Sequence, residues 1–158
     1  MSSSVAAIRA NFSNAKVLII ENNEDQWVLM SRAWQQRLGE VTTERVATIQ
    51  QAMSLLEAWR YQEWEIPKLI LLDLYLPRRE DGWRFMTWIK AMPASISLVP
   101  IVMLSSSADP VDIEQSYQVG ISAYVVKPVD FAGWVTYFNE LRFYWWETAS
   151  LPPLSLGY

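Results

Sequence analysis

The sequence predicts an α/β fold: a doubly wound, five-stranded parallel sheet in the order 2-1-3-4-5, the middle layer of a three-layer sandwich. Five short apolar runs alternate with stretches of helical periodicity along the chain. These runs are almost continuously apolar, as in parallel strands that are covered on both faces. Right-handed crossovers then place helices on both sides, and 2-1-3-4-5 is the simplest order for such units.

The first half of the chain supplies two strand–helix units. Lys16 to Ile20 is predicted as the first strand, and it ends in an acidic loop at residues 21–25. Glu24 to Leu38 has the apolar spacing of a helix, and Val41 to Val46 is a weaker second strand. Thr48 is suited to cap the next helix. That helix has an apolar stripe made of Ile49, Ala52, Met53, Leu56 and Trp59.

The second half supplies the remaining units. Lys68 to Leu72 is predicted as the third strand and leads directly into Asp73. A helix is expected from Gly82 to Met92, where Pro93 stops it. The elements expected after it are a strand at Val99–Leu104, a helix from Asp109 or Pro110 to Gly120, a strand at Ala123–Val126, and a last helix from its cap Asp130 to about Thr148.

The length of 158 residues suits one domain with a proper core. Residues 1–14 lack the basic and apolar regions of a signal peptide, so we expect a flexible leader there. The domain is then predicted over 15–148, followed by a C-terminal tail at 149–158. No apolar run approaches membrane-spanning length, and we expect a cytoplasmic protein without membrane contact.

The composition excludes several kinds of site. The chain has no cysteine and no histidine, which removes disulfides, thiolate metal sites and the commonest general base. A site must therefore use carboxylates, hydroxyls, lysine and arginine, and such oxygen ligands favour Mg²⁺ or Ca²⁺ over Zn²⁺. The net charge of −4 argues against a nucleic-acid-binding surface.

Polar residues follow four of the predicted strands. Glu21 and Asn22 follow the first strand, Asp73 the third, Ser105 the fourth and Lys127 the fifth. Because the carboxyl ends of parallel strands meet at one edge, these groups should converge near the switch point between strands one and three. Carboxylates, an amide, a hydroxyl and an ammonium group together suit a divalent cation beside a phosphoryl group.

Four motifs follow one another between Lys16 and Trp146. They are the loop 20–25, the run Asp73-Leu74-Tyr75-Leu76-Pro77 with Asp81-Gly82, the run 100–105, and the run 120–128. With these motifs the chain resembles the receiver domain of response regulators, the acceptor half of two-component signalling, with its CheY-like, flavodoxin-like fold. It looks most like the single-domain regulators associated with bacterial phytochromes.

The resemblance implies a role for each matching residue. Asp73 would accept a phosphoryl group from a histidine kinase or phosphotransfer protein, Lys127 would pair with it, and Ser105 would turn towards the phosphoryl oxygens. Tyr124 would change rotamer and pass the signal to a downstream protein. The chain would be a signalling protein rather than an enzyme. The resemblance also implies a Mg²⁺ site made of Glu21, Asn22, Asp73 and the backbone carbonyl of Tyr75.

Asn22 departs from the family's pattern, because it stands where an acid normally contacts the metal. A lost unit charge a few Å away is worth on the order of 4 kcal/mol before hydration offsets it, so we expect weak Mg²⁺ binding. The alternative is a pseudo-receiver that binds partners without phosphorylation. A phosphatase that used Asp73 as its nucleophile would need a second acid two residues further on, where this chain has Tyr75. A flavodoxin-like cofactor binder would need a glycine- or threonine-rich phosphate loop after the first strand, and this chain has an acidic loop there.

The last helix has more aromatic side chains than one buried stripe requires. Phe143, Tyr144 and Trp146 are left over once its apolar stripe is assigned. An aromatic excess on a terminal helix is typical of a partner surface, so we expect these residues and the tail to form an interface, with a homodimer as one assembly. The alternative is that these side chains cover the protein's own sheet.

Overall fold

The computed structural model describes residues 2–12, 15–147 and 151–152 of the chain. Its centre is a five-stranded parallel sheet in the order β2-β1-β3-β4-β5, which confirms the predicted fold and strand order. The observed strands differ from the predicted ranges by no more than two residues at either end. They are β1 (Lys16–Ile20), β2 (Thr42–Val46), β3 (Leu69–Asp73), β4 (Ile101–Ser105) and β5 (Ala123–Val126).

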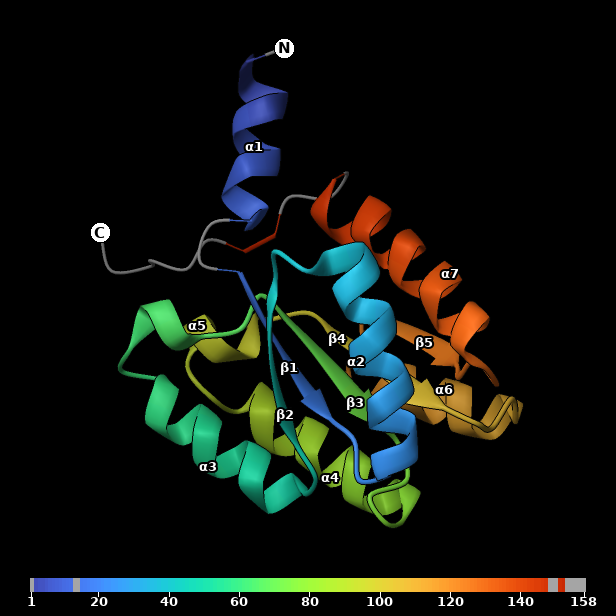
Figure 1. Ribbon diagram of the computed structural model, residues 1–158. Helices are drawn as coiled ribbons and strands as arrows, with labels where there is room; N and C mark the ends of the chain where they lie inside the picture. The colour runs from blue at the N-terminus through green and yellow to red at the C-terminus, as the bar shows by residue number, and fades with distance from the viewer. Residues whose placement is uncertain (1, 13–14, 148–150, 153–158) are drawn as a thin grey trace.

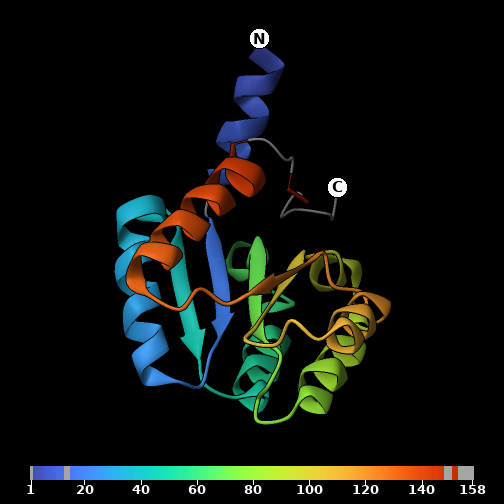
Figure 2. The same ribbon diagram turned by 90° about the vertical axis from the view of Figure 1, so that its right-hand side faces the viewer.

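Helices cover both faces of this sheet (Figures 1 and 2). On one face lie α2 (Glu24–Leu38) and α7 (Phe131–Leu141). On the other face lie α3 (Ile49–Trp59) and α4 (Arg79–Lys90), while α6 (Pro110–Gln118) packs beside β5. The result is the three-layer arrangement that parallel strands require, because both sides of their apolar side chains are buried.

The α2–α7 face shows how tryptophan and phenylalanine fill the core. The rings of Trp34 and Phe138 meet edge to face at 5.0 Å, and those of Trp134 and Phe138 lie 5.4 Å apart. All three side chains are fully buried. The indole nitrogen of Trp34 donates to the Val41 carbonyl at 2.9 Å, so its polar atom is satisfied inside the core.

Strand register brings the polar strand ends into line. Ile20 of β1 pairs with Leu72 of β3, and Ser105 of β4 pairs with Val126 of β5. The residues that follow these pairs therefore emerge at one edge of the sheet. Two predicted helix caps are also present: Thr48 accepts from Gln51 N at 3.1 Å and belongs to a capping box, and Asp130 accepts from Gly133 N at 2.8 Å.

Some elements differ from the sequence prediction. Helix α4 begins at Arg79 rather than at Gly82, because the Asp81 carboxylate caps the chain by accepting from Arg78 N at 3.2 Å. The chain continues α7 into η2 (Arg142–Trp146), a short π-helix, and the predicted end near Thr148 lies outside the described residues. Two short elements had no sequence signal. They are η1 (Glu63–Glu65) and α5 (Ala94–Ser97).

The expected flexible leader contains a helix, α1 (Ser2–Phe12). Its last turn contacts the other end of the chain: Asn11 Nδ2 donates to the Trp146 carbonyl at 3.1 Å, and Asn11 Oδ1 accepts from Leu151 N at 3.0 Å. These contacts join residues far apart in sequence, which is why local patterns did not predict them. Within the described ranges, none of the helices is long and apolar enough to cross a membrane.

Candidate functional site

Three of the predicted site residues meet at the carboxyl edge of the sheet. Lys127 Nζ lies 2.8 Å from Glu21 Oε1 and 3.0 Å from Asp73 Oδ2. Glu21 follows β1, Asp73 ends β3 and Lys127 follows β5, so three strand ends at the same edge of the sheet contribute one charged group each. Glu21 is 1% exposed and Asp73 7% exposed, which leaves this ion triad almost entirely buried.

Backbone amides hold the second oxygen of each carboxylate. Tyr75 N donates to Asp73 Oδ1 at 3.1 Å, and Asn23 N donates to Glu21 Oε2 at 3.0 Å. Each acid thus has one oxygen on Lys127 and the other on the loop that follows its own strand. Both carboxylates are thereby oriented before any ligand arrives, which is the preorganisation that a site for charged groups needs.

The triad has two acids and only one lysine, and this shifts the pKa values of its members. Burial raises the pKa of Asp73 to about 6; Lys127 opposes this rise and Glu21 adds to it. Burial also lowers the pKa of Lys127, but the attraction of Asp73 and Glu21 outweighs it and leaves that pKa above its ordinary value. The lysine therefore stays charged, while the charge on Asp73 is costly and open to compensation by a further positive group.

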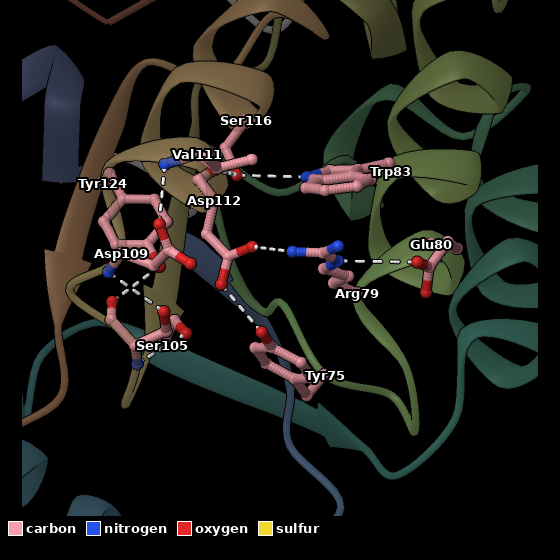
Figure 3. Close-up of polar contacts among 11 residues, drawn as sticks. Tyr75, Arg79, Glu80, Trp83, Ser105, Asp109, Val111, Asp112, Ser116 and Tyr124 are labelled. Atoms are coloured by element: carbon pink, nitrogen blue, oxygen red, sulfur yellow. Dashed lines mark hydrogen bonds and ion pairs between the residues drawn. The ribbon is translucent and has the colours of Figure 1, made fainter.

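Ser105 and Tyr124, both labelled in Figure 3, each contact Ser107. Ser105 is fully buried at the end of β4, and its Oγ accepts from Ser107 N at 3.0 Å. The hydroxyl of Tyr124, on β5, donates to the Ser107 carbonyl at 2.8 Å. The predicted hydroxyl and the predicted switch aromatic are therefore joined through one residue of the loop between β4 and α6.

Comparison with known proteins agrees with this geometry. The family model described as the response regulator receiver domain matches residues 17–138, more than half of the chain. The chain belongs to the response regulator receiver domain family.

Several relatives are similar over most of this receiver domain. The probable methanogenesis regulatory protein FilR2 of Methanothrix harundinacea is 29% identical over 132 residues, 82% of each chain. The response regulator Rcp1 of Synechocystis is 32% identical over 92 residues, 58% of this chain and 61% of Rcp1.

Solved structures agree with the sequence relatives. The phosphorylated cyanobacterial phytochrome response regulator RcpA is 29% identical with a TM-score of 0.76, covering 87% of this chain and 98% of RcpA. The Mn²⁺-bound form of Rcp1 is 25% identical with a TM-score of 0.73, covering 87% of this chain and 99% of that one.

The oxygen atoms at the edge of the receiver domain fit a hard divalent cation. Glu21 and Asp73 would supply carboxylates, Asn22 an amide oxygen and Tyr75 a backbone carbonyl, and such oxygen-only sets suit Mg²⁺. Within the part of the chain that the structure describes, no group of three or more His, Cys, Asp and Glu side chains could hold a metal. The donor set therefore fits such an ion with less charge than a triple-acid site would have.

Asn22 is exposed to solvent. It lines a groove of about 630 Å³ together with residues of α3, of α4 and of the loops before them, which include Thr48, Leu76, Phe85 and Trp88. The ion triad does not include Asn22. Its amide would have to complete the metal site from the solvent side.

One residue of the site region was missed by the sequence analysis. Asp112, in the first turn of α6, is 1% exposed and accepts from the Tyr75 hydroxyl at 2.7 Å and from Arg79 Nη1 at 2.7 Å. Figure 3 shows its carboxylate between these two side chains. An acid in the first turn of a helix is typical of an exposed N-terminus, so the sequence carried no signal of its burial.

The residues predicted for an interface separate into two groups. Phe143 is 64% exposed and Tyr144 53% exposed, so both remain available on η2. Trp146 is fully buried, and its ring lies 6.5 Å from that of Phe12 of α1. Trp146 therefore packs inside its own chain, and the prediction that placed it on the interface is wrong. The reason is helix α1, which covers Trp146 and was not expected from the sequence.

Proposed function

We propose that this receiver domain accepts a phosphoryl group on Asp73 from a histidine kinase or phosphotransfer protein and signals through protein contacts. The buried Asp73–Lys127–Glu21 triad at the carboxyl edge of the sheet is the observation that carries the proposal. The phosphorylated state of the related RcpA is consistent with it. Asp73 combines a carboxylate at the end of β3 with a backbone amide on one oxygen and Lys127 on the other.

The transfer itself forms one bond and breaks one. An Asp73 oxygen attacks the phosphorus atom, the bond between phosphorus and the donor's imidazole nitrogen breaks, and the electron pair stays with the imidazole. Lys127, already 3.0 Å from Asp73, then pairs with the negative charge that the phosphoryl group adds. The Ser105 hydroxyl donates to a phosphoryl oxygen after it turns away from Ser107.

The same edge would hold Mg²⁺ through Glu21, Asp73, Asn22 and the backbone carbonyl of Tyr75. Such a cation, when bound, neutralises carboxylate and phosphoryl charge. The Mn²⁺-bound form of the related Rcp1 supports a divalent ion. Because Asn22 contributes an oxygen without a charge, we expect weaker binding than a third acid would provide.

The mass of the intact protein after incubation with acetyl phosphate and Mg²⁺ tests the proposal. We expect the mass of one phosphoryl group to be added to the unmodified chain and none to Asp73→Asn. The matched control is Glu114→Gln, which removes an exposed acid on α6 and should leave the uptake unchanged. If neither the unmodified chain nor Asn22→Asp gains mass, the phosphoacceptor role is wrong and the pseudo-receiver role applies.

We also propose that the protein works in the cytoplasm and pairs with a second copy of itself through Phe143 and Tyr144. Two exposed aromatic rings at the end of the last helix support this contact. Light scattering after gel filtration measures the assembly, and the change of both residues to serine should reduce the mass to that of one chain. Tyr61→Ser is the control, because Tyr61 is 79% exposed on a different part of the surface. A monomeric unmodified protein would contradict the dimer.

A further inference from the structure

Asp112 joins the segment after the acceptor residue to helix α6. The Tyr75 hydroxyl and Arg79 Nη1 each lie 2.7 Å from its carboxylate, on separate oxygens. Tyr75 stands two residues after Asp73 and its backbone amide contacts the Asp73 carboxylate, while Arg79 begins α4. A single buried acid thus ties the acceptor loop and α4 to the neighbouring helix (Figure 3).

Asp112 also lies close in the chain to the loop that follows Ser105. Burial raises the pKa of Asp112, but hydrogen bonds from Tyr75, Ser107 and Arg79 outweigh it and hold this pKa below its ordinary value. Ser107 is also the residue whose amide holds Ser105 Oγ and whose carbonyl holds the Tyr124 hydroxyl. The loop between β4 and α6 is therefore held at Ser107 by Ser105 and Tyr124, and it leads into the first turn of α6, where Asp112 lies.

A second contact strengthens the connection between α4 and α6. Trp83 Nε1 donates to Ser116 Oγ at 3.1 Å, and the Ser116 hydroxyl donates to the Asp112 carbonyl at 2.7 Å. Arg79 also stacks over the Trp83 ring, 5.4 Å from its centroid. Helix α6 is thus held against α4 by one charged and one neutral connection, and both include Asp112.

We propose that Asp112 is a positioning residue that latches the start of α6, and with it the β4–α6 loop, in its resting conformation through Tyr75 and Arg79. This inference rests on the proposed function. For Ser105 Oγ to reach a phosphoryl oxygen, it must leave the Ser107 amide, and that movement disturbs a loop which Asp112 helps to hold. A contact made only in the resting state opposes the switch by its own free energy, so its loss favours the switched state.

Two variants remove the latch in different ways. Asp112→Asn removes the charge and keeps the shape, and Tyr75→Phe removes only the hydroxyl that donates to Asp112. Glu114→Gln is the matched control, since it removes an exposed acid two residues further along α6. Because both latch variants act on one contact, their combined effect should be smaller than the sum of the separate effects.

Hydrogen exchange of the unphosphorylated protein tests the latch without the transfer reaction. We expect exchange at residues 105–112 to become at least about fivefold faster in both latch variants, with β1 and β3 unchanged. The control should behave like the unmodified chain. An increase spread over the whole sheet would indicate a merely structural role, and no increase at 105–112 would overturn the latch.

Affinity for beryllium fluoride with Mg²⁺, a phosphoryl mimic, tests the direction of the effect. Loss of the latch should tighten its binding at least about fivefold, whereas simple structural damage would weaken it. Unchanged or weaker binding by both variants, when the unmodified chain binds, overturns the proposal. If the unmodified chain binds no beryllium fluoride, the proposed phosphoacceptor function fails, and the exchange result alone decides the latch.

Discussion

The charge on Asp73 should cost the metal-free protein stability at neutral pH. A free aspartate has a pKa of about 3.9, whereas burial raises that of Asp73 to about 6. Each pKa unit corresponds to about 1.4 kcal/mol, so the ionised carboxylate lowers the free energy of unfolding by about 3 kcal/mol. Asp73→Asn removes this charge and keeps the shape, and we expect it to stabilise the protein by about that amount at pH 7.

The sign of the pH dependence follows from proton binding. Between about pH 4 and pH 6 the folded state holds the Asp73 proton more tightly than the unfolded state, so the free energy of unfolding falls as the pH rises. Asp73→Asn lacks this slope. The stability difference between variant and unmodified chain should therefore grow from near zero at about pH 4 to about 3 kcal/mol at pH 7.

Urea unfolding in the presence of a chelator, repeated from pH 4 to pH 7, measures this difference. Glu114→Gln, which removes an exposed carboxylate on α6, is the control variant. A gain below about 1 kcal/mol at pH 7, or a gain that does not change with pH, would refute the reasoning. Excess Mg²⁺ should stabilise the unmodified chain more than Asp73→Asn, because Asp73 is a proposed ligand. The difference in free energy of unfolding between the two proteins should therefore become smaller.

Three further predictions concern the same edge of the sheet. Lys127→Met leaves two buried carboxylates without their cation, so urea unfolding should show a free energy of unfolding lower by about 3–5 kcal/mol. Adding Asp73→Asn to this variant should recover part of that loss. A loss below about 1 kcal/mol would contradict a buried triad in which Lys127 pairs with both acids. Asn22→Asp adds an exposed charge worth about 1 kcal/mol or more, so Mg²⁺ affinity should rise at least about fivefold by titration calorimetry; an unchanged affinity would exclude Asn22 as a ligand. Gly82→Ala places a Cβ 2.6 Å from the Leu74 carbonyl oxygen. That clash should lower the free energy of unfolding by about 1–3 kcal/mol, and an equally stable variant would show that α4 shifts freely.

Local patterns were sufficient for the strands and for most helices. The apolar runs at β1, β3 and β4 and the caps Thr48 and Asp130 are recognisable within a few residues. Helix α1 was missed because its last turn depends on contacts with η2 and Leu151. The burial of Trp146 was missed for the same reason, because the residues that cover it come from the opposite end of the chain.

The sequence by itself determined which chemical groups end each strand, and therefore which groups share one edge once the strands are parallel and ordered. It could do so because strand period and strand ends are local properties. Only the tertiary structure decided which atoms pair, because the two partners of Lys127 lie far from it in the chain: Asp73 is 54 positions away and Glu21 is 106 positions away. It also decided that Asp112 is buried between Tyr75 and Arg79, because that burial depends on how α6 packs against α4.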